Sequence, residues 1–191
     1  MICVVSGIHR SGTSMMMHVL EAGGITPYWS KHREMNMMRG KDRYQPNPDK
    51  FLEIGQENYM RLGMVHEIPN HCAVKIQAIG LPILAPAKSY KIIYMRRDPE
   101  AIKRSYIKAF NEKGFDQLYP SWPDHYWQLL DGVKGIMQTR RDVDLIELWY
   151  DDVLANPEMT IELLCAHGVP IKNKQAAIDV IDPSHRRFEV A

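Results

Sequence analysis

The stretch ICVVSGIHRSGTS, residues 2–14, decides how the chain folds. Its first part, Ile2 to Ser6, is almost wholly apolar and has the length of a buried parallel strand. A helical pattern follows from about Thr13 to Ala22 and ends in two glycines. The order of strand, glycine loop and helix predicts an α/β domain, and it predicts that the loop binds a phosphate.

The loop Gly7–Ser14 has the composition of a phosphate cradle. Glycines let successive backbone N–H groups point inward, and the N-terminus of the following helix adds partial positive charge. Arg10 supplies a permanent, forked charge, and the hydroxyls supply further donors. The alternative is a plain glycine turn whose arginine points to solvent. The predicted phosphate-binding residues are Gly7, His9, Arg10, Ser11, Gly12, Thr13 and Ser14.

This loop differs from the ATP-binding P-loop, which requires a lysine where Thr13 stands. The apolar run Ile92–Met95 also ends in Arg96 and Arg97, and not in a carboxylate that could hold magnesium. We therefore expect a phosphate that is bound by arginines without a metal. This expectation disfavours a kinase or an ATPase.

Three further apolar runs predict buried parallel strands, at Cys72–Ile76, Lys91–Met95 and Asp144–Trp149. Helices are expected to begin at Pro99 and at Pro157, the second with Asn156 as its N-cap and Gly168 as its stop. Strands that alternate with helices indicate an α/β fold with a central parallel β-sheet flanked by helices. The length favours a single domain over residues 1–191.

A second anion site is indicated by Arg97 and Ser105. Arg97 lies at the carboxyl end of a predicted strand, where open α/β sheets bind their ligands. Ser105 follows about two turns into the next predicted helix. The arginine would hold a phosphate by charge and fork geometry, and the serine would add a hydroxyl donor. Without the first loop, an arginine that has a purely structural role would explain this position equally well.

Together these motifs resemble those of sulfotransferases. The loop Gly7–Ser14 resembles their 5′-phosphosulfate loop, and Arg97 with Ser105 resembles their 3′-phosphate site. The segment Trp149–Glu158 is similar to the family's Tyr-Glu-Asp-Leu…Asn-Pro-Glu sequence. The tail Ile181–Arg187 resembles the closing segment of small bacterial and viral members.

The resemblance implies a three-layer P-loop-type fold and the donor 3′-phosphoadenosine 5′-phosphosulfate (PAPS). The implied reaction transfers the sulfuryl group of PAPS to a hydroxyl or an amine of an acceptor. Arg10 would be catalytic, since it would stabilise charge on the bridging oxygen as sulfur leaves it. Arg97 and Ser105 would hold the 3′-phosphate. Arg187, or Arg186 in a shifted register, would close over the nucleotide.

The resemblance leaves the general base open. Lys75 matches a lysine of soluble sulfotransferases and is expected to be catalytic, but Gln77 stands where those enzymes have a histidine. An amide does not titrate near neutral pH, so Gln77 cannot be the base. Other branches use a glutamate after the first helix, and Glu34 is the best candidate, ahead of Asp42, Glu53 and His32. His9 replaces a proline of many relatives, and it either lies beside the loop or reaches the acceptor.

Residues 28–50 show no clean period, although they include two prolines and the methionines 35, 37 and 38. A long irregular segment in a compact domain is commonly functional. We interpret it as a mobile segment over the active site, and the alternative is a surface loop without a role. Its methionines would suit an adaptable acceptor pocket, since methionine repacks readily.

The composition excludes several classes of protein. A net charge of +1 over 191 residues argues against a general nucleic-acid binder and against a polybasic membrane binder. Cys3, Cys72 and Cys165 are far apart and form no paired motif, so we expect neither a disulfide framework nor a metal site. No apolar stretch reaches the roughly 20 residues of a membrane span.

We therefore expect a cytoplasmic protein whose partner is a small-molecule acceptor. Two alternatives to a sulfotransferase stay open at this point. One is a nucleotide or metabolite kinase on the related fold, and the other is a nucleotide-binding protein without turnover. The absence of an assigned base keeps the second alternative in consideration.

Overall fold

A computed structural model describes residues 1–28, 68–86, 88–109, 115–117 and 120–182. The described residues form a five-stranded sheet in the order β2-β3-β1-β4-β5, with every neighbouring pair parallel. The strands are β1 (Ile2–Gly7), β2 (Thr26–Pro27), β3 (Cys72–Gln77), β4 (Tyr90–Arg96) and β5 (Val143–Trp149). The four strands predicted from apolar runs are confirmed, and β2 is an addition.

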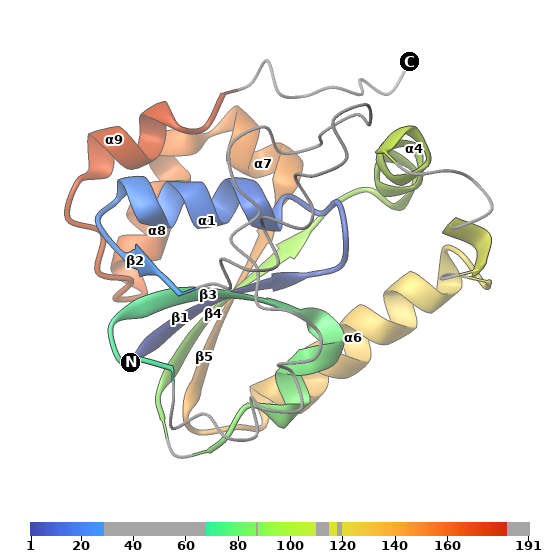
Figure 1. Cartoon of the computed structure of the whole chain (residues 1–191), viewed down its shortest axis with the longest axis horizontal. Helices are drawn as coiled ribbons and strands as arrows, with labels where there is room; N and C mark the ends of the chain where they lie inside the picture. The colour runs from blue at the N-terminus through green and yellow to red at the C-terminus, as the bar shows by residue number, and fades with distance from the viewer. Residues whose placement is uncertain (29–67, 87, 110–114, 118–119, 183–191) are drawn as a thin grey trace.

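Helices cover both faces of this sheet, so the molecule has three layers (Figure 1). One face carries α1 (Thr13–Ala22), α7 (Tyr150–Ala155), α8 (Pro157–Ala166) and α9 (Lys174–Asp179). The other face carries the short 3₁₀ helix η3 (Ala78–Ile83) and the long α6 (Asp124–Gln138). The helix α4 (Pro99–Ala109) follows β4. The predicted α/β fold with a central parallel sheet is confirmed.

Alternation along the strands builds the two cores. In β1, Ile2 and Val4 pack with the η3 and α6 side, whereas Cys3 and Val5 pack with the α1 and α8 side. Successive side chains of a strand point to opposite faces. Because both faces of β1 are buried, the strand is apolar at almost every position, which made it recognisable in the sequence.

Helix boundaries agree with the sequence, with one correction. The helix α8 begins at Pro157 as predicted, but the Asn156 side chain makes no capping hydrogen bond. The Asn156 carbonyl instead accepts hydrogen bonds from the N–H and the hydroxyl of Thr160, at 3.0 and 2.9 Å. Gly168 follows the helix with a φ of +74°. The N–H of Gly168 donates to Cys165 and that of Val169 to Leu164, which is the Schellman pattern of a helix end.

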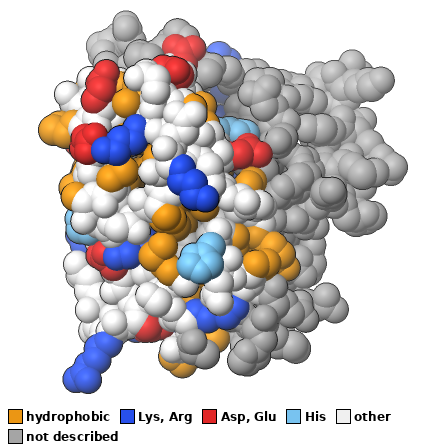
Figure 2. Space-filling model, turned by 90° about the vertical axis from the view of Figure 1, so that its left-hand side faces the viewer, with side chains coloured by type: hydrophobic (Ala, Val, Ile, Leu, Met, Phe, Trp, Pro, Cys, Tyr) orange, Lys and Arg blue, Asp and Glu red, His pale blue; other side chains and the backbone are white. Residues whose placement is uncertain are grey.

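The described helices include none that is both long and apolar enough to cross a membrane. Figure 2 shows the face that lies on the left of Figure 1. Basic and acidic side chains are interspersed on this face, and hydrophobic side chains lie among them in small groups.

Candidate nucleotide-binding site

The predicted site residues gather at the carboxyl end of the sheet. β1 lies at the centre, and the chain passes first to β2 and β3 on one side and then to β4 on the other. Open parallel sheets bind ligands where the connections diverge in this way. The β1–α1 loop and the β4–α4 connection lie at this same end (Figure 1).

The β1–α1 loop has the backbone conformation that its glycines permit. Gly7 has a φ of +151° and Gly12 a φ of +94°. A Cβ atom on Gly7 would lie 2.7 Å from the carbonyl oxygen of Met95, and one on Gly12 would lie 2.4 Å from the Tyr150 ring. Both positions therefore exclude any side chain. Arg10 has a φ of +69°, an uncommon conformation for a residue other than glycine.

Ser11 stabilises the loop from within. Its side chain is fully buried, and its hydroxyl donates to the Ile8 carbonyl at 2.8 Å. Its backbone N–H donates to the same carbonyl at 3.3 Å. Both donors of Ser11 are thus used inside the loop, and its contact with phosphate stays a prediction.

The loop directly contacts the second predicted anion site. The Arg10 Nε atom donates to the Ser105 hydroxyl at 2.9 Å. The Arg97 Nη1 atom donates to the backbone carbonyl of Arg10 at 3.0 Å. These bonds join residues that are 95 and 87 positions apart in the chain. The structure therefore brings Arg10, Arg97 and Ser105 together, as the two-site interpretation requires.

The guanidinium of Arg97 is almost enclosed by protein. Arg97 is only 7% exposed, and its Nε atom has no hydrogen-bond partner among the described residues. The guanidinium carbon lies 4.3 Å from the centre of the Tyr150 ring, in the geometry of a cation–π contact. Burial lowers the pKa of Arg97, and the opposing influence of Tyr150 and Asp151 is smaller. A buried cation with a donor left over suits an anionic ligand.

Lys75 and Gln77 extend the site along β3. Lys75 is 6% exposed, and its Nζ atom donates to the Ser14 hydroxyl at 2.9 Å. The side-chain nitrogen of Gln77 lies 2.8 Å from the Nε2 atom of His9. Both contacts bind the end of β3 to the β1–α1 loop. Lys75 therefore places a second buried cation beside the N-terminus of α1.

Two tyrosines of this site were not assigned roles from the sequence. The Tyr126 hydroxyl on α6 hydrogen-bonds the backbone of Arg97, and Tyr150 at the start of α7 lies against the Arg97 guanidinium. Tyr126 is fully buried. The sequence could have indicated such a role only through chemistry, because a buried tyrosine hydroxyl needs a hydrogen-bond partner.

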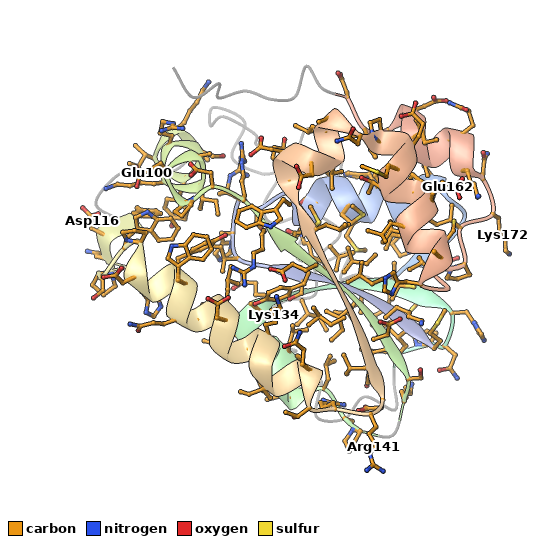
Figure 3. The ribbon with its side chains drawn as sticks, turned by 180° about the vertical axis from the view of Figure 1, so that it is seen from behind. Glu100, Asp116, Lys134, Arg141, Glu162 and Lys172 are labelled. Atoms are coloured by element: carbon orange, nitrogen blue, oxygen red, sulfur yellow. The ribbon has the colours of Figure 1, made fainter. Side chains whose placement is uncertain are left out.

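Arg96 lies on the opposite face of the sheet from this site. It forms ion pairs with Asp131 and Glu147, and Lys134 on α6, labelled in Figure 3, joins the Glu147 carboxylate. Its guanidinium also lies 5.5 Å from the centre of the Trp127 ring. Alternation at the end of β4 separates the two neighbouring arginines, so Arg96 belongs to the packing of α6 and Arg97 to the candidate site.

Glu34 and Arg187 lie outside the described residues, as does the segment 29–50, so their roles stay predictions. Within the described part of the chain, no cluster of three His, Cys, Asp or Glu residues has the arrangement of a metal site.

Of three comparisons with known proteins, the one with solved structures finds proteins similar to this chain. The chain matches no family model and no curated protein sequence. Solved structures do match. One is a retinol dehydratase in complex with androsterone and the inactive cofactor PAP, with a TM-score of 0.53 and 17% sequence identity. The likeness shows the fold. It covers 96% of this chain and 63% of the retinol dehydratase chain, so this chain spans less than two thirds of that protein's length.

Proposed function

We propose that this protein transfers the sulfuryl group of PAPS to a hydroxyl or an amine of a small acceptor. The observation that carries the proposal is the direct contact between the two predicted anion sites. Arg97 binds the backbone of the β1–α1 loop, and Arg10 of that loop binds Ser105. One nucleotide with a 5′-phosphosulfate and a 3′-phosphate can therefore reach both sites.

The residues present fit such a nucleotide. Gly7 and Gly12 have positive φ values, and backbone amides that turn inward in such a loop can bind a 5′-phosphate. The unused Nε donor of Arg97 offers a hydrogen bond to a 3′-phosphate. The complex of retinol dehydratase supports this assignment, because the PAP named there is PAPS without its sulfuryl group.

PAPS supplies an activated sulfuryl group, and the protein supplies positive charge around it. Lys75 donates to Ser14 at the start of α1, and Arg10 of the preceding loop donates to Ser105 on α4. Cations held in fixed positions stabilise charge that develops on a leaving oxygen. Losing one donor of this type commonly costs about 10²–10³-fold in rate.

Several parts of this proposal concern residues beyond the described ones. Arg187 would close over the nucleotide, and residues 28–50 would cover the acceptor within a single domain over residues 1–191. The androsterone of the retinol dehydratase complex supports a small-molecule acceptor. Cys3, Cys72 and Cys165 are all free, and the cytoplasmic location stays a part of the proposal.

A thermal-shift titration tests the proposal. Adenosine 3′,5′-bisphosphate (PAP) without magnesium should stabilise the protein by about 2.7 kcal/mol at 100 times its dissociation constant. AMP at the same concentration should stabilise it less, because AMP lacks the 3′-phosphate. Equal stabilisation by the two nucleotides overturns the assignment of Arg97 and Ser105. Stabilisation by ATP only with magnesium would favour a kinase instead.

A transfer assay separates an enzyme from a binding protein. Radiolabelled PAPS is incubated with the protein and a panel of small alcohols, phenols and amines. The proposal expects labelled sulfate on at least one acceptor. Binding of PAP without transfer to any acceptor, or to water, would indicate a nucleotide-binding protein.

A further inference from the structure

The contact between His9 and Gln77 joins the phosphate loop to the end of β3. Gly7 and Gln77 are register partners in the β1–β3 pair, and His9 follows two residues later. The His9 Nε2 atom lies 2.8 Å from the Gln77 side-chain nitrogen, whereas the His9 Nδ1 atom lies 3.5 Å from it. Both side chains are half-buried, so the imidazole is held in position and still reachable.

This pair has the chemistry of a proton acceptor. A neutral imidazole keeps a lone pair on one ring nitrogen, whichever tautomer it adopts. The amide of Gln77 can present its nitrogen or its oxygen to the ring, because a rotation of the amide exchanges the two at equal shape. When the ring takes up a proton, the Gln77 oxygen can accept a charge-assisted hydrogen bond from Nε2–H. Only His9 of the two titrates.

The other charged groups of the site have different tasks. Arg10 and Lys75 donate to hydroxyls as cations, and Arg97 donates to a backbone carbonyl. The Asp98 carboxylate accepts from the Ala101 N–H at the start of α4. The other histidines of the described part belong to other elements, namely His18 on α1, His71 before β3, His125 on α6 and His167 after α8. Among the described residues, His9 is thus the histidine that belongs to the β1–α1 loop.

We propose that His9 is the general base of the sulfuryl transfer and that Gln77 positions it. This inference rests on the proposed function. A proton passes from the acceptor hydroxyl to the imidazole, and the oxygen uses its electron pair to form the new bond to sulfur. The bond between sulfur and the bridging oxygen breaks, and its electron pair stays on the 5′-phosphate of the nucleotide. The sequence candidate Glu34 lies outside the described residues, so the contact between His9 and Gln77 carries this proposal by itself.

The first test replaces the base with a group of similar shape that does not titrate. In His9→Gln, the rate of transfer from PAPS to 2-naphthol should fall about 10²–10⁴-fold, the contribution of a general base. The affinity for PAP should fall far less than the rate, because Arg10, Arg97 and the loop amides are intact. An unchanged rate overturns the proposal. A PAP affinity that falls as much as the rate also overturns it, since His9 would then act only in the predicted phosphate loop.

Acceptor acidity provides a second readout that a merely structural role would not alter. The more acidic 4-nitrophenol is already partly ionised near neutral pH and depends less on a base, so His9→Gln should lose far less rate with it than with 2-naphthol. An equal loss with both phenols contradicts the assignment.

A swap of the two residues supplies the matched control. The double variant His9→Gln/Gln77→His returns an imidazole to the other side of the same contact. It should recover part of the rate that the single variant loses with 2-naphthol. If the double variant is as slow as the single variant and still binds PAP normally, the proposed roles of His9 and Gln77 are contradicted.

The outcomes also separate this inference from the proposed function. A wild-type protein that binds PAP but transfers no sulfuryl group to either phenol or to water contradicts the proposed function. The assignment of His9 as general base is then contradicted as well. A wild-type protein that transfers the group equally well after His9→Gln keeps the proposed function and loses only the base.

Discussion

The Tyr126 hydroxyl holds the backbone of Arg97 from both sides. It donates to the Arg97 carbonyl at 2.7 Å and accepts from the Arg97 N–H at 3.3 Å. Burial raises the pKa of Tyr126 to about 12, so the hydroxyl keeps its proton at neutral pH. A residue on α6 thus fixes the point from which the Arg97 guanidinium extends into the candidate site.

Removing this hydroxyl should weaken the recognition of the 3′-phosphate. In Tyr126→Phe, the preference for PAP over AMP should fall about 3–10-fold, because a net hydrogen bond contributes about 0.5–1.5 kcal/mol. The free energy of unfolding should fall by about 1 kcal/mol for the same reason. Calorimetric titration and urea unfolding measure the two effects.

Tyr94→Phe is the matched control for this prediction. The Tyr94 hydroxyl is also buried and donates to a backbone carbonyl of α6, that of Leu130, at 3.0 Å. Its removal should cost similar stability and leave the preference for PAP unchanged. If both variants keep the preference, Tyr126 supports the fold without positioning Arg97.

Shortening Arg97 should remove the selectivity for the 3′-phosphate more completely. We expect Arg97→Ala to bind PAP about 10–100-fold more weakly, the range for a lost hydrogen bond to a charged group. Arg97→Lys keeps the positive charge but loses the forked guanidinium. Its affinity for PAP should therefore lie between those of the wild-type protein and Arg97→Ala. Calorimetric titration with PAP and with AMP measures the affinity and the selectivity. An Arg97→Ala variant that still prefers PAP over AMP would contradict the role of Arg97 in binding the 3′-phosphate.

A methyl group at Gly12 should distort the loop. Gly12→Ala combines a positive φ with a Cβ only 2.4 Å from the Tyr150 ring, so the variant should lose about 1–3 kcal/mol of stability. Gly135→Ala on α6 is the control, because no described atom lies within 4 Å of its added Cβ. This second variant should gain about 0.5–1 kcal/mol from helix propensity. Urea unfolding tests whether the free energy of unfolding falls in Gly12→Ala and rises in Gly135→Ala.

Acid should weaken the ion pair between Arg140 and Asp142. The hydrogen bond from Arg140 is the main reason that the pKa of Asp142 lies below its ordinary value. A lowered folded-state pKa stabilises the protein above about pH 4, and that contribution is lost as the pH falls through the folded-state value. Asp142→Asn should therefore cost about 1 kcal/mol at pH 7 and progressively less toward pH 3. A constant difference in unfolding free energy across this range would exclude the linkage.

The strands that could be predicted from the sequence are those formed by uninterrupted runs of mostly apolar residues. β1, β3 and β4 are buried at almost every position, and such strands read as apolar runs. In the edge strand β5 only Ile146 and Leu148 are buried. β2 has two residues, Thr26 and Pro27, which are too few to show any period. The six-residue α7 begins directly after β5, so its pattern merges with that of the strand.

The proximity of Arg10, Arg97 and Ser105 could be expected from the sequence, whereas the side chains that hold them could not. Arg10, Arg97 and Ser105 follow from the position of each residue relative to a strand or a loop. The partners Tyr126 and Tyr150 depend on how α6 and α7 pack, which is a tertiary property with no local pattern. The His9–Gln77 contact likewise depends on the register of β1 with β3.

The hydrogen bond between Arg10 and Ser105 closes a loop of 95 residues. Contacts between such distant positions form late, because the entropy of closing a long loop must be overcome first. A nascent chain that has not yet emerged from the ribosome as far as α4 holds only half of the site. A ligand that needs both halves of the candidate site would therefore stabilise only chains in which the β1–α1 loop and α4 have come together.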